Sequence, residues 1–225
     1  MSAAAILLCG LSAASLSIDT LRAHEAGSSL SLERIWAIPP DAGHGKTLYQ
    51  LHCRPCHGSH GWGDGPRAIP ALAGQREKYL IAQLVHFAEG RRSGQGMHDT
   101  MQQPDLNWPQ AIRDLAAFLS TAPRSPGPEY SGDPDLSVGR RLYKAACKDC
   151  HGPSAEGTAA GVPALGGQQY RYLTEQLDNF SAEHRDAANP RLPPAVAMAS
   201  LSTRDVEDIA NYLAHLSYLT ADNAQ

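Results

Sequence analysis

The sequence predicts an all-α protein made of two tandem helical domains. Two observations support this fold class. The chain repeats itself with an offset of 93 to 94 residues, and each copy ends with apolar residues at helical spacing. These residues are Ile112, Leu115, Ala116 and Leu119 in the first copy, and Val206, Ile209, Ala210 and Leu213 in the second. Each copy is therefore expected to close with an amphipathic helix.

The other repeated segments follow the same order in both copies. Each copy opens with Gly and, four residues on, Tyr, at 45–49 and 139–143. A C-x-x-C-H-G motif and a glycine-rich loop lead to a Pro-Ala-Leu-x-Gly-Gln segment at 70–75 and 163–168. A segment with matching Tyr-Leu, Gln-Leu and Phe comes next and predicts a helix in each copy. Ser202 or Thr203 is expected to cap the last helix of the second copy.

Domain boundaries follow from the repeat and from a change of composition between the copies. Residues 41–122 are predicted as the first domain and 134–219 as the second, joined by a Pro/Gly-rich linker at 123–133. Residues 1–26 are predicted as a signal peptide or export segment, because they begin with an apolar stretch rich in small residues. That stretch is too short to be expected to span a membrane.

Composition and charge narrow the function. The chain has 225 residues and a formal net charge of -4, so no basic excess points to nucleic acid. Aromatic residues make up only 6% of the sequence, a small supply for the cores of two domains. A bound cofactor is therefore expected to fill part of each interior.

Four of the five cysteines lie in two C-x-x-C-H motifs, the attachment signature for c-type haem. The residues are Cys53, Cys56 and His57, and Cys147, Cys150 and His151. On a helix, positions i, i+3 and i+4 share one face, so two thiols can add to the haem vinyl groups while the imidazole reaches the iron. A four-cysteine zinc site is disfavoured because 90 residues separate the pairs. The motifs predict two covalently bound haem c groups.

Each iron also needs axial ligands. His57 and His151 are the proximal candidates, and the carbonyl of Pro70 or Pro163 is a candidate acceptor for their second ring nitrogen. Met101 is the expected sixth ligand of the first haem.

The second domain leaves more than one choice for its sixth ligand. Met198 is the only methionine near the equivalent position and is our candidate. Coordination by His184 and an open iron remain the alternatives. The isolated histidines His60 and His98 are expected in loops, and His86 is expected to pack within a helix.

On these motifs, the chain from about residue 45 to 216 resembles the dihaem cytochrome c4 family. The resemblance implies two cytochrome c-like helical domains, each wrapped around a covalent haem c and facing each other about a pseudo-twofold axis. It also implies His and Met ligands at each iron. The family's second methionine position falls on Pro194 here, which leaves the second haem's coordination open.

The resemblance implies a periplasmic carrier of single electrons between a donor dehydrogenase or quinol-linked complex and a terminal acceptor. Its redox partners would be an oxidase, a dehydrogenase or a membrane cytochrome complex, and peripheral membrane association stays open. The alternative is a haem enzyme or enzyme subunit, like a thiosulfate dehydrogenase or a peroxidase, with an open or displaceable ligand at the second haem. The sequence favours the carrier, because no additional acid, base or cysteine constellation accompanies the second motif.

Overall fold

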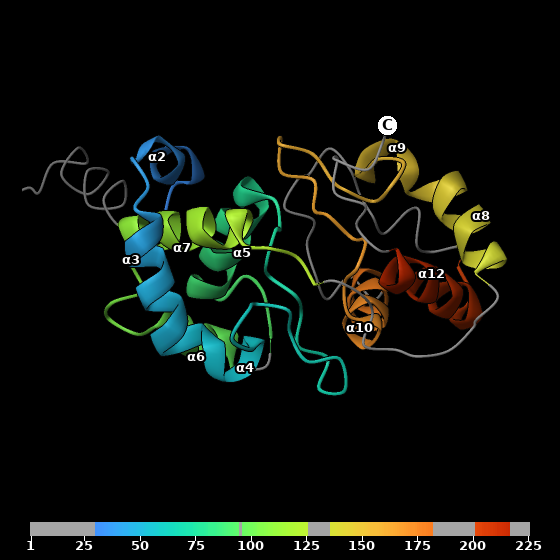
Figure 1. The fold of residues 1–225 in the computed structure, drawn as a ribbon, viewed down its shortest axis with the longest axis horizontal. Helices are drawn as coiled ribbons and strands as arrows, with labels where there is room; N and C mark the ends of the chain where they lie inside the picture. Colours follow the sequence, from blue (N-terminus) through green and yellow to red (C-terminus); the bar gives the residue numbers. More distant parts are fainter. Residues whose placement is uncertain (1–29, 95, 126–135, 182–200, 217–225) are drawn as a thin grey trace, which may run out of the picture.

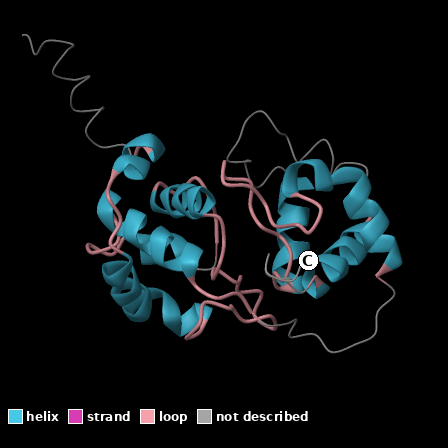
Figure 2. Cartoon of the chain, turned by 45° about the horizontal axis from the view of Figure 1, so that its top comes forward, coloured by secondary structure: helices cyan, strands magenta, loops and turns pink. Residues whose placement is uncertain are grey.

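The computed structural model describes residues 30–94, 96–125, 136–181 and 201–216. Regular structure in these ranges is helical, and one isolated antiparallel bridge joins Asp64 to Ile69 (Figure 2). Two helical bodies lie side by side along the long axis of the molecule (Figure 1). The prediction of an all-α fold with two tandem domains is confirmed.

The first domain contains seven of the described helical segments. They are α2 (Leu32–Ala37), α3 (Ala42–Leu48), the π-helix η1 (Tyr49–Cys53), α4 (Arg54–His57), α5 (Glu77–Ala88), α6 (Met97–Met101) and α7 (Pro109–Thr121). The described part of the second domain contains four. They are α8 (Ser137–Ala146), α9 (Lys148–His151), α10 (Tyr170–Ser181) and α12 (Thr203–His215). None of these helices is long and apolar enough to cross a membrane.

In each domain, a glycine lies where the helix that leads to the C-x-x-C-H motif crosses the last helix of the domain. A Cβ atom on Gly45 of α3 would lie 2.0 Å from the carbonyl oxygen of Asp114 in α7. A Cβ atom on Gly139 of α8 would lie 2.0 Å from the carbonyl oxygen of Asp208 in α12. Both helix pairs therefore approach so closely that only glycine fits.

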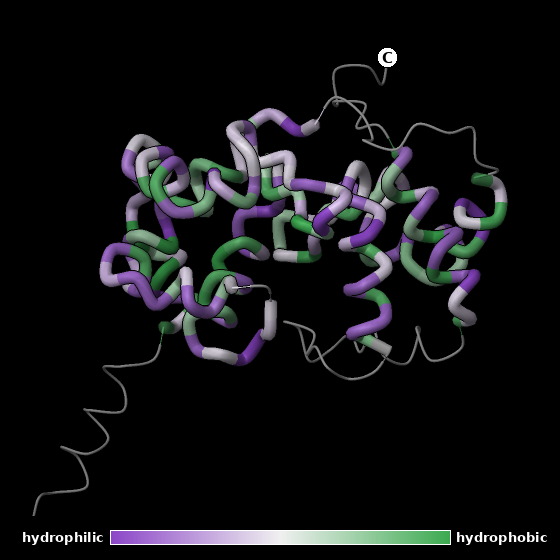
Figure 3. Tube along the Cα trace, turned by 90° about the horizontal axis from the view of Figure 1, so that it is seen from below, coloured by the Kyte–Doolittle hydropathy of each residue, from purple (hydrophilic) through white to green (hydrophobic). Residues whose placement is uncertain are grey.

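The apolar positions predicted from periodicity form the cores. Ile112, Leu115 and Leu119 of α7 are at most 2% exposed and pack with residues of α3 and α5. Ile209 and Leu213 of α12 are each 1% exposed and pack with Tyr143 of α8 and Leu173 of α10. Figure 3 shows hydrophobic and hydrophilic residues alternating along the helices of both domains.

The N-terminus of α12 forms as predicted. The Ser202 hydroxyl accepts a hydrogen bond from the Asp205 amide, while the Asp205 carboxylate accepts one from the Ser202 amide. This reciprocal capping box satisfies two amide donors at the helix start. The hydrogen bonds with Ser202 hold the pKa of Asp205 below its usual value.

Helix α2 precedes the predicted start of the first domain at residue 41, and no sequence pattern indicated it. Ile35 is fully buried in the first core. The Lys78 ammonium lies 4.7 Å and the Arg113 guanidinium 4.9 Å from the centre of the Trp36 ring. These cation–π contacts attach α2 to α5 and α7.

Candidate functional site

The first C-x-x-C-H motif lies on two consecutive helical turns. Cys53 ends η1, and Cys56 and His57 lie in α4. Gly58 then leaves the helix with a φ of 79°, a backbone conformation that favours glycine. The Tyr49 hydroxyl donates to the Gly58 carbonyl oxygen at 2.5 Å and closes this turn. The motif is therefore held at both ends.

The imidazole of His57 is oriented by one hydrogen bond. Its Nδ1 atom lies 3.0 Å from the carbonyl oxygen of Pro70, and the side chain is almost fully buried. With Nδ1 donating to that carbonyl, Nε2 is the ring nitrogen that can bind iron. The prediction that Pro70 supplies the acceptor is confirmed.

The second motif repeats this arrangement. Cys147 lies between α8 and α9, and Cys150 and His151 lie in α9. His151 Nδ1 lies 3.0 Å from the Pro163 carbonyl oxygen, and the Tyr143 hydroxyl donates to the Gly152 carbonyl at 2.5 Å. The second proline also has the predicted role.

Burial sets the protonation of these groups. It is the main cause that lowers the pKa values of His57 and His151, which favours the neutral imidazole that a metal requires. Burial and the neighbouring cysteine raise the pKa of Cys53 to about 12 and that of Cys147 to about 11. All four motif cysteines are free thiols, so none is committed to a disulfide.

The described residues do not assemble a zinc site from the two cysteine pairs. Within those ranges, no three side chains of His, Cys, Asp or Glu come together to hold a metal ion. The two cysteine pairs lie apart, one in each domain.

Met101 is the last residue of α6 and is only 1% exposed, within the first core. Helix α6 replaces the loop expected around His98, whose Nδ1 lies 2.8 Å from the Phe87 carbonyl oxygen. His86 is buried on α5, as predicted. Met198, its alternative His184, and Pro194 lie outside the described residues, as does the predicted export segment at 1–26.

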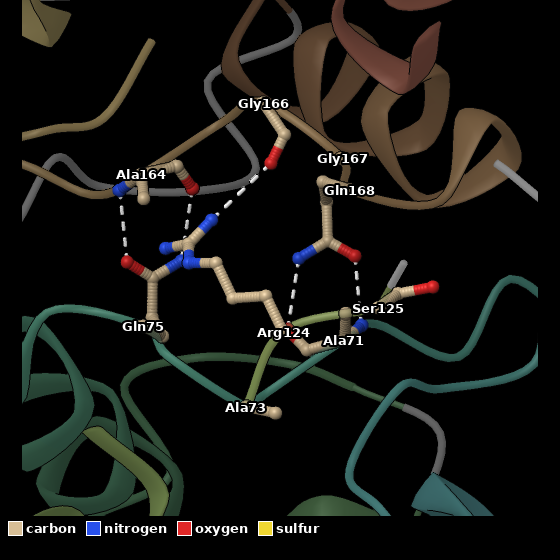
Figure 4. A pocket seen from close by; sticks show the side chains of 9 residues that line it. All are labelled: Ala71, Ala73, Gln75, Arg124, Ser125, Ala164, Gly166, Gly167 and Gln168. Carbon is tan, nitrogen blue, oxygen red and sulfur yellow. Dashed lines mark hydrogen bonds between the residues drawn. The ribbon is translucent and has the colours of Figure 1, made fainter. Parts of the chain in front are cut away.

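The repeated glutamines join the two domains, a role that the sequence pattern did not indicate. The Gln168 side chain donates to the Ala71 carbonyl at 2.9 Å and accepts from the Ala71 amide at 2.7 Å. The Gln75 side chain makes the same two bonds to Ala164, at 2.9 and 2.8 Å (Figure 4). Each glutamine side-chain amide forms two hydrogen bonds with one alanine of the other domain, in the same way in both directions. The interface therefore has pseudo-twofold symmetry.

Further polar contacts surround these pairs. Arg76 Nε donates to the Glu156 carbonyl at 2.6 Å, and the side chain at the equivalent position, Gln169, donates to the Trp62 carbonyl at 2.7 Å. Arg124, at the start of the predicted linker, donates to the carbonyls of Gly74 and Gly166. The cavity beside them has a volume of about 20 Å³, which is room for a water molecule rather than a substrate (Figure 4).

A buried arginine adds a second link between the domains. Arg92 donates to Gln83 of its own domain at 2.7 Å, and to the Tyr172 hydroxyl and Gln176 of α10 at 2.8 and 3.1 Å. Its guanidinium group also lies 4.5 Å from the centre of the Phe87 ring. Sequence reasoning missed Arg92, because two adjacent arginines in a glycine-rich run carry no signal that one of them is buried.

Comparison with known proteins agrees with this architecture. The chain matches the cytochrome c family over residues 42–123 and again over 136–217. Cytochrome c4 of Thiocapsa roseopersicina is 34% identical over 189 residues, covering 79% of this chain and 93% of that protein. A protein of Thiomonas intermedia named thiosulfate dehydrogenase electron acceptor is 31% identical over 187 residues, covering 79% and 81%.

A solved structure shows the same two-domain arrangement. The crystal structure of reduced recombinant cytochrome c4 from Pseudomonas stutzeri has a TM-score of 0.67 and 30% sequence identity to this chain. The match covers 79% of this chain and 99% of that one. Two haem-binding motifs on two cytochrome c domains define a dihaem c-type cytochrome that carries electrons. Within that class, the chain belongs to the cytochrome c4 family.

The residues present fit two covalent haem c groups. Each domain supplies two free thiols three residues apart, followed directly by a histidine. That histidine has its Nδ1 engaged by a backbone carbonyl and a pKa lowered by burial. These are the properties that thioether attachment and iron coordination need.

Proposed function

We propose that the four motif cysteines form the thioether bonds to haem and that His57 and His151 are the proximal iron ligands. The hydrogen bonds to Pro70 and Pro163 support this assignment, because each holds an imidazole ring with Nε2 available. Haem supplies the one-electron chemistry when bound. The chain orients the two imidazoles, favours their neutral form, and buries that of His57 almost fully and that of His151 partly.

Met101 is the proposed sixth ligand of the first haem. Its burial in the core and its position at the end of α6 support this role. A thioether ligand raises the reduction potential and closes the iron to external ligands. Met198 is the proposed sixth ligand of the second haem, and His184 or an open iron would replace it if that assignment fails.

The proposed role is a periplasmic carrier with two closed irons. It would take single electrons from a donor dehydrogenase or a quinol-linked complex and pass them to a terminal acceptor. The relative named thiosulfate dehydrogenase electron acceptor supports a dehydrogenase as donor. The observation that carries the proposal is the pair of oriented histidines, one in each of two domains that are joined by reciprocal hydrogen bonds.

A haem enzyme is the second candidate function, and one sequence feature favours it. Pro194 stands at the position where the resemblance expects a methionine. An open second iron could bind a substrate, as in the thiosulfate dehydrogenase-like and peroxidase-like alternatives.

Carbon monoxide titration of the dithionite-reduced holoprotein separates these functions. The carrier predicts two haems per chain and no rapid binding. Met101→Ala and Met198→Ala should each open one iron, so each variant should bind one equivalent. Rapid binding of one equivalent by the unmodified protein would reject the closed second site. An unchanged spectrum in Met198→Ala would reject Met198 as a ligand.

A further inference from the structure

A single peptide group connects each proposed iron-binding histidine to the opposite domain. The carbonyl of Pro70 accepts from His57 Nδ1 at 3.0 Å. The amide of the same peptide group belongs to Ala71 and donates to Gln168 Oε1 at 2.7 Å. The chain of bonds therefore runs from His57 in the first domain to Gln168 in the second.

The second domain contains the mirror arrangement. The carbonyl of Pro163 accepts from His151 Nδ1 at 3.0 Å, and the amide of Ala164 donates to Gln75 Oε1 at 2.8 Å. His151 is thus linked to a glutamine of the first domain. The same series of histidine, proline carbonyl, alanine amide and glutamine occurs in both domains. The connection is therefore a property of the fold and its interface.

The glutamines are held firmly in this position. Gln75 and Gln168 are only 7% and 8% exposed. The side-chain nitrogen of each donates to the carbonyl of the same alanine that donates to its oxygen. Each Oε1 also accepts a hydrogen bond from the backbone amide of the residue that follows the glutamine, Arg76 or Gln169. The acceptor atoms are consequently fixed against the peptide groups, with little water to compete.

Hydrogen bonds in such a chain polarise one another. An acceptor on the N–H side of a peptide group makes its carbonyl oxygen more negative. The carbonyl then accepts more strongly from the imidazole Nδ1–H, which makes Nε2 a better electron donor to a metal. A more basic ligand stabilises the oxidised iron and lowers its reduction potential.

We propose that Gln168 and Gln75 are positioning residues that tune the haem of the opposite domain through these peptide groups. Gln168 lowers the potential of the haem bound by His57, and Gln75 lowers that of the haem bound by His151. The inference rests on the proposed histidine ligation. It assigns to the interface glutamines an electronic role in addition to holding the domains together.

The test is spectroelectrochemical titration of the holoprotein and of the variants Gln168→Met and Gln75→Met. Methionine keeps similar length and removes the amide acceptor. Each variant should favour reduction of the haem in the opposite domain by roughly threefold, which is about 28 mV at 59 mV per tenfold change. The haem of the variant's own domain should keep its potential. Met101→Ala identifies the first haem by its altered spectrum.

Gln169→Met is the matched control, because Gln169 also bonds across the interface, to the Trp62 carbonyl, outside the Pro70–Ala71 peptide group. Gln169→Met should change the reduction potential of the first haem less than Gln168→Met does. Nuclear magnetic resonance of the His57 Nδ1 proton gives a second readout, and Gln168→Met should shift it towards the position of a weaker hydrogen bond.

Three results would overturn the inference: no shift of potential in either variant, a shift of the haem in the variant's own domain, or an equal shift in Gln169→Met. If one glutamine variant does not fold, its mirror variant carries the test. The proposed function is checked separately, by two one-electron transitions in the unmodified protein. Two such transitions would support the proposed function even if the glutamine variants leave both potentials unchanged.

Discussion

The glycine at the helix crossing of the first domain allows a sharp test of packing. Replacement of Gly45 by alanine would place a methyl carbon 2.0 Å from the Asp114 carbonyl oxygen and 2.4 Å from its carbonyl carbon. These are backbone atoms of α7, so no side chain can rotate away. Helices α3 and α7 would have to separate by about 1.4 Å to reach the 3.4 Å at which ordinary contact begins.

The cost of this separation is a weaker dispersion attraction between the two helices. A gap of 0.5 to 1 Å forfeits a quarter to a half of the dispersion energy of the facing atoms. A buried leucine makes roughly 40 atomic contacts of about 0.1 kcal/mol, so weakening them by even a quarter, the lower end of this range, costs about 1 kcal/mol per side chain. Leu48 and Leu115 are both buried in this core, which gives about 2 kcal/mol. Alanine has a higher helix propensity than glycine, which offsets about 1 kcal/mol of this loss of stability.

Gly43→Ala is the matched control in the same helix. Its added Cβ would meet only the Asp41 carboxylate oxygen, at 3.2 Å, which belongs to a side chain. Both variants gain the same propensity, so the difference between them isolates the crossing. Guanidinium unfolding of the holoprotein, followed by far-ultraviolet circular dichroism, should place Gly45→Ala about 2 kcal/mol below Gly43→Ala. Equal free energies of unfolding for the two variants would refute the close-packing argument.

Three further predictions concern the second domain and the interface. Ser202→Ala should lower the free energy of unfolding by about 0.5–2 kcal/mol through loss of the capping box, measured by denaturation with Thr203→Ala as control. Tyr143→Phe should cost about 1–3 kcal/mol, because the Gly152 carbonyl loses its hydroxyl donor, and an unchanged midpoint would contradict this. Arg124→Ala removes donors to a carbonyl in each domain, so calorimetry should show the two domains unfolding further apart in temperature, whereas one unchanged transition would speak against a linking role.

Local sequence patterns predicted much of the fold. The apolar spacing located α7 and α12, because a helix that buries one face must repeat apolar residues with its own period. The Ser202 cap and the Pro70 and Pro163 acceptors also follow from short-range chemistry. Each of these features depends on residues that lie close together in sequence, or on a repeat that displays the same feature twice.

The interface shows why other features escaped prediction. Gln75 and Gln168 stand at equivalent positions of the sequence repeat. Their partners are backbone groups of Ala164 and Ala71, which no side-chain pattern can indicate. Helix α2 has six residues, too few to display a helical period. Met198 was chosen by elimination rather than by spacing, and it stays a prediction because it lies outside the described residues.

The chemistry of the interface indicates what holds the two domains in one arrangement. Its central contacts are buried hydrogen bonds between glutamine amides and backbone groups. A small displacement of one domain against the other would leave several buried donors and acceptors unpaired, which costs about 1–3 kcal/mol for each group. Correct pairing adds little net stability, but every alternative arrangement is penalised. The glutamine pairs therefore select one orientation of the domains, and with it one fixed relation between the two histidines proposed to bind haem.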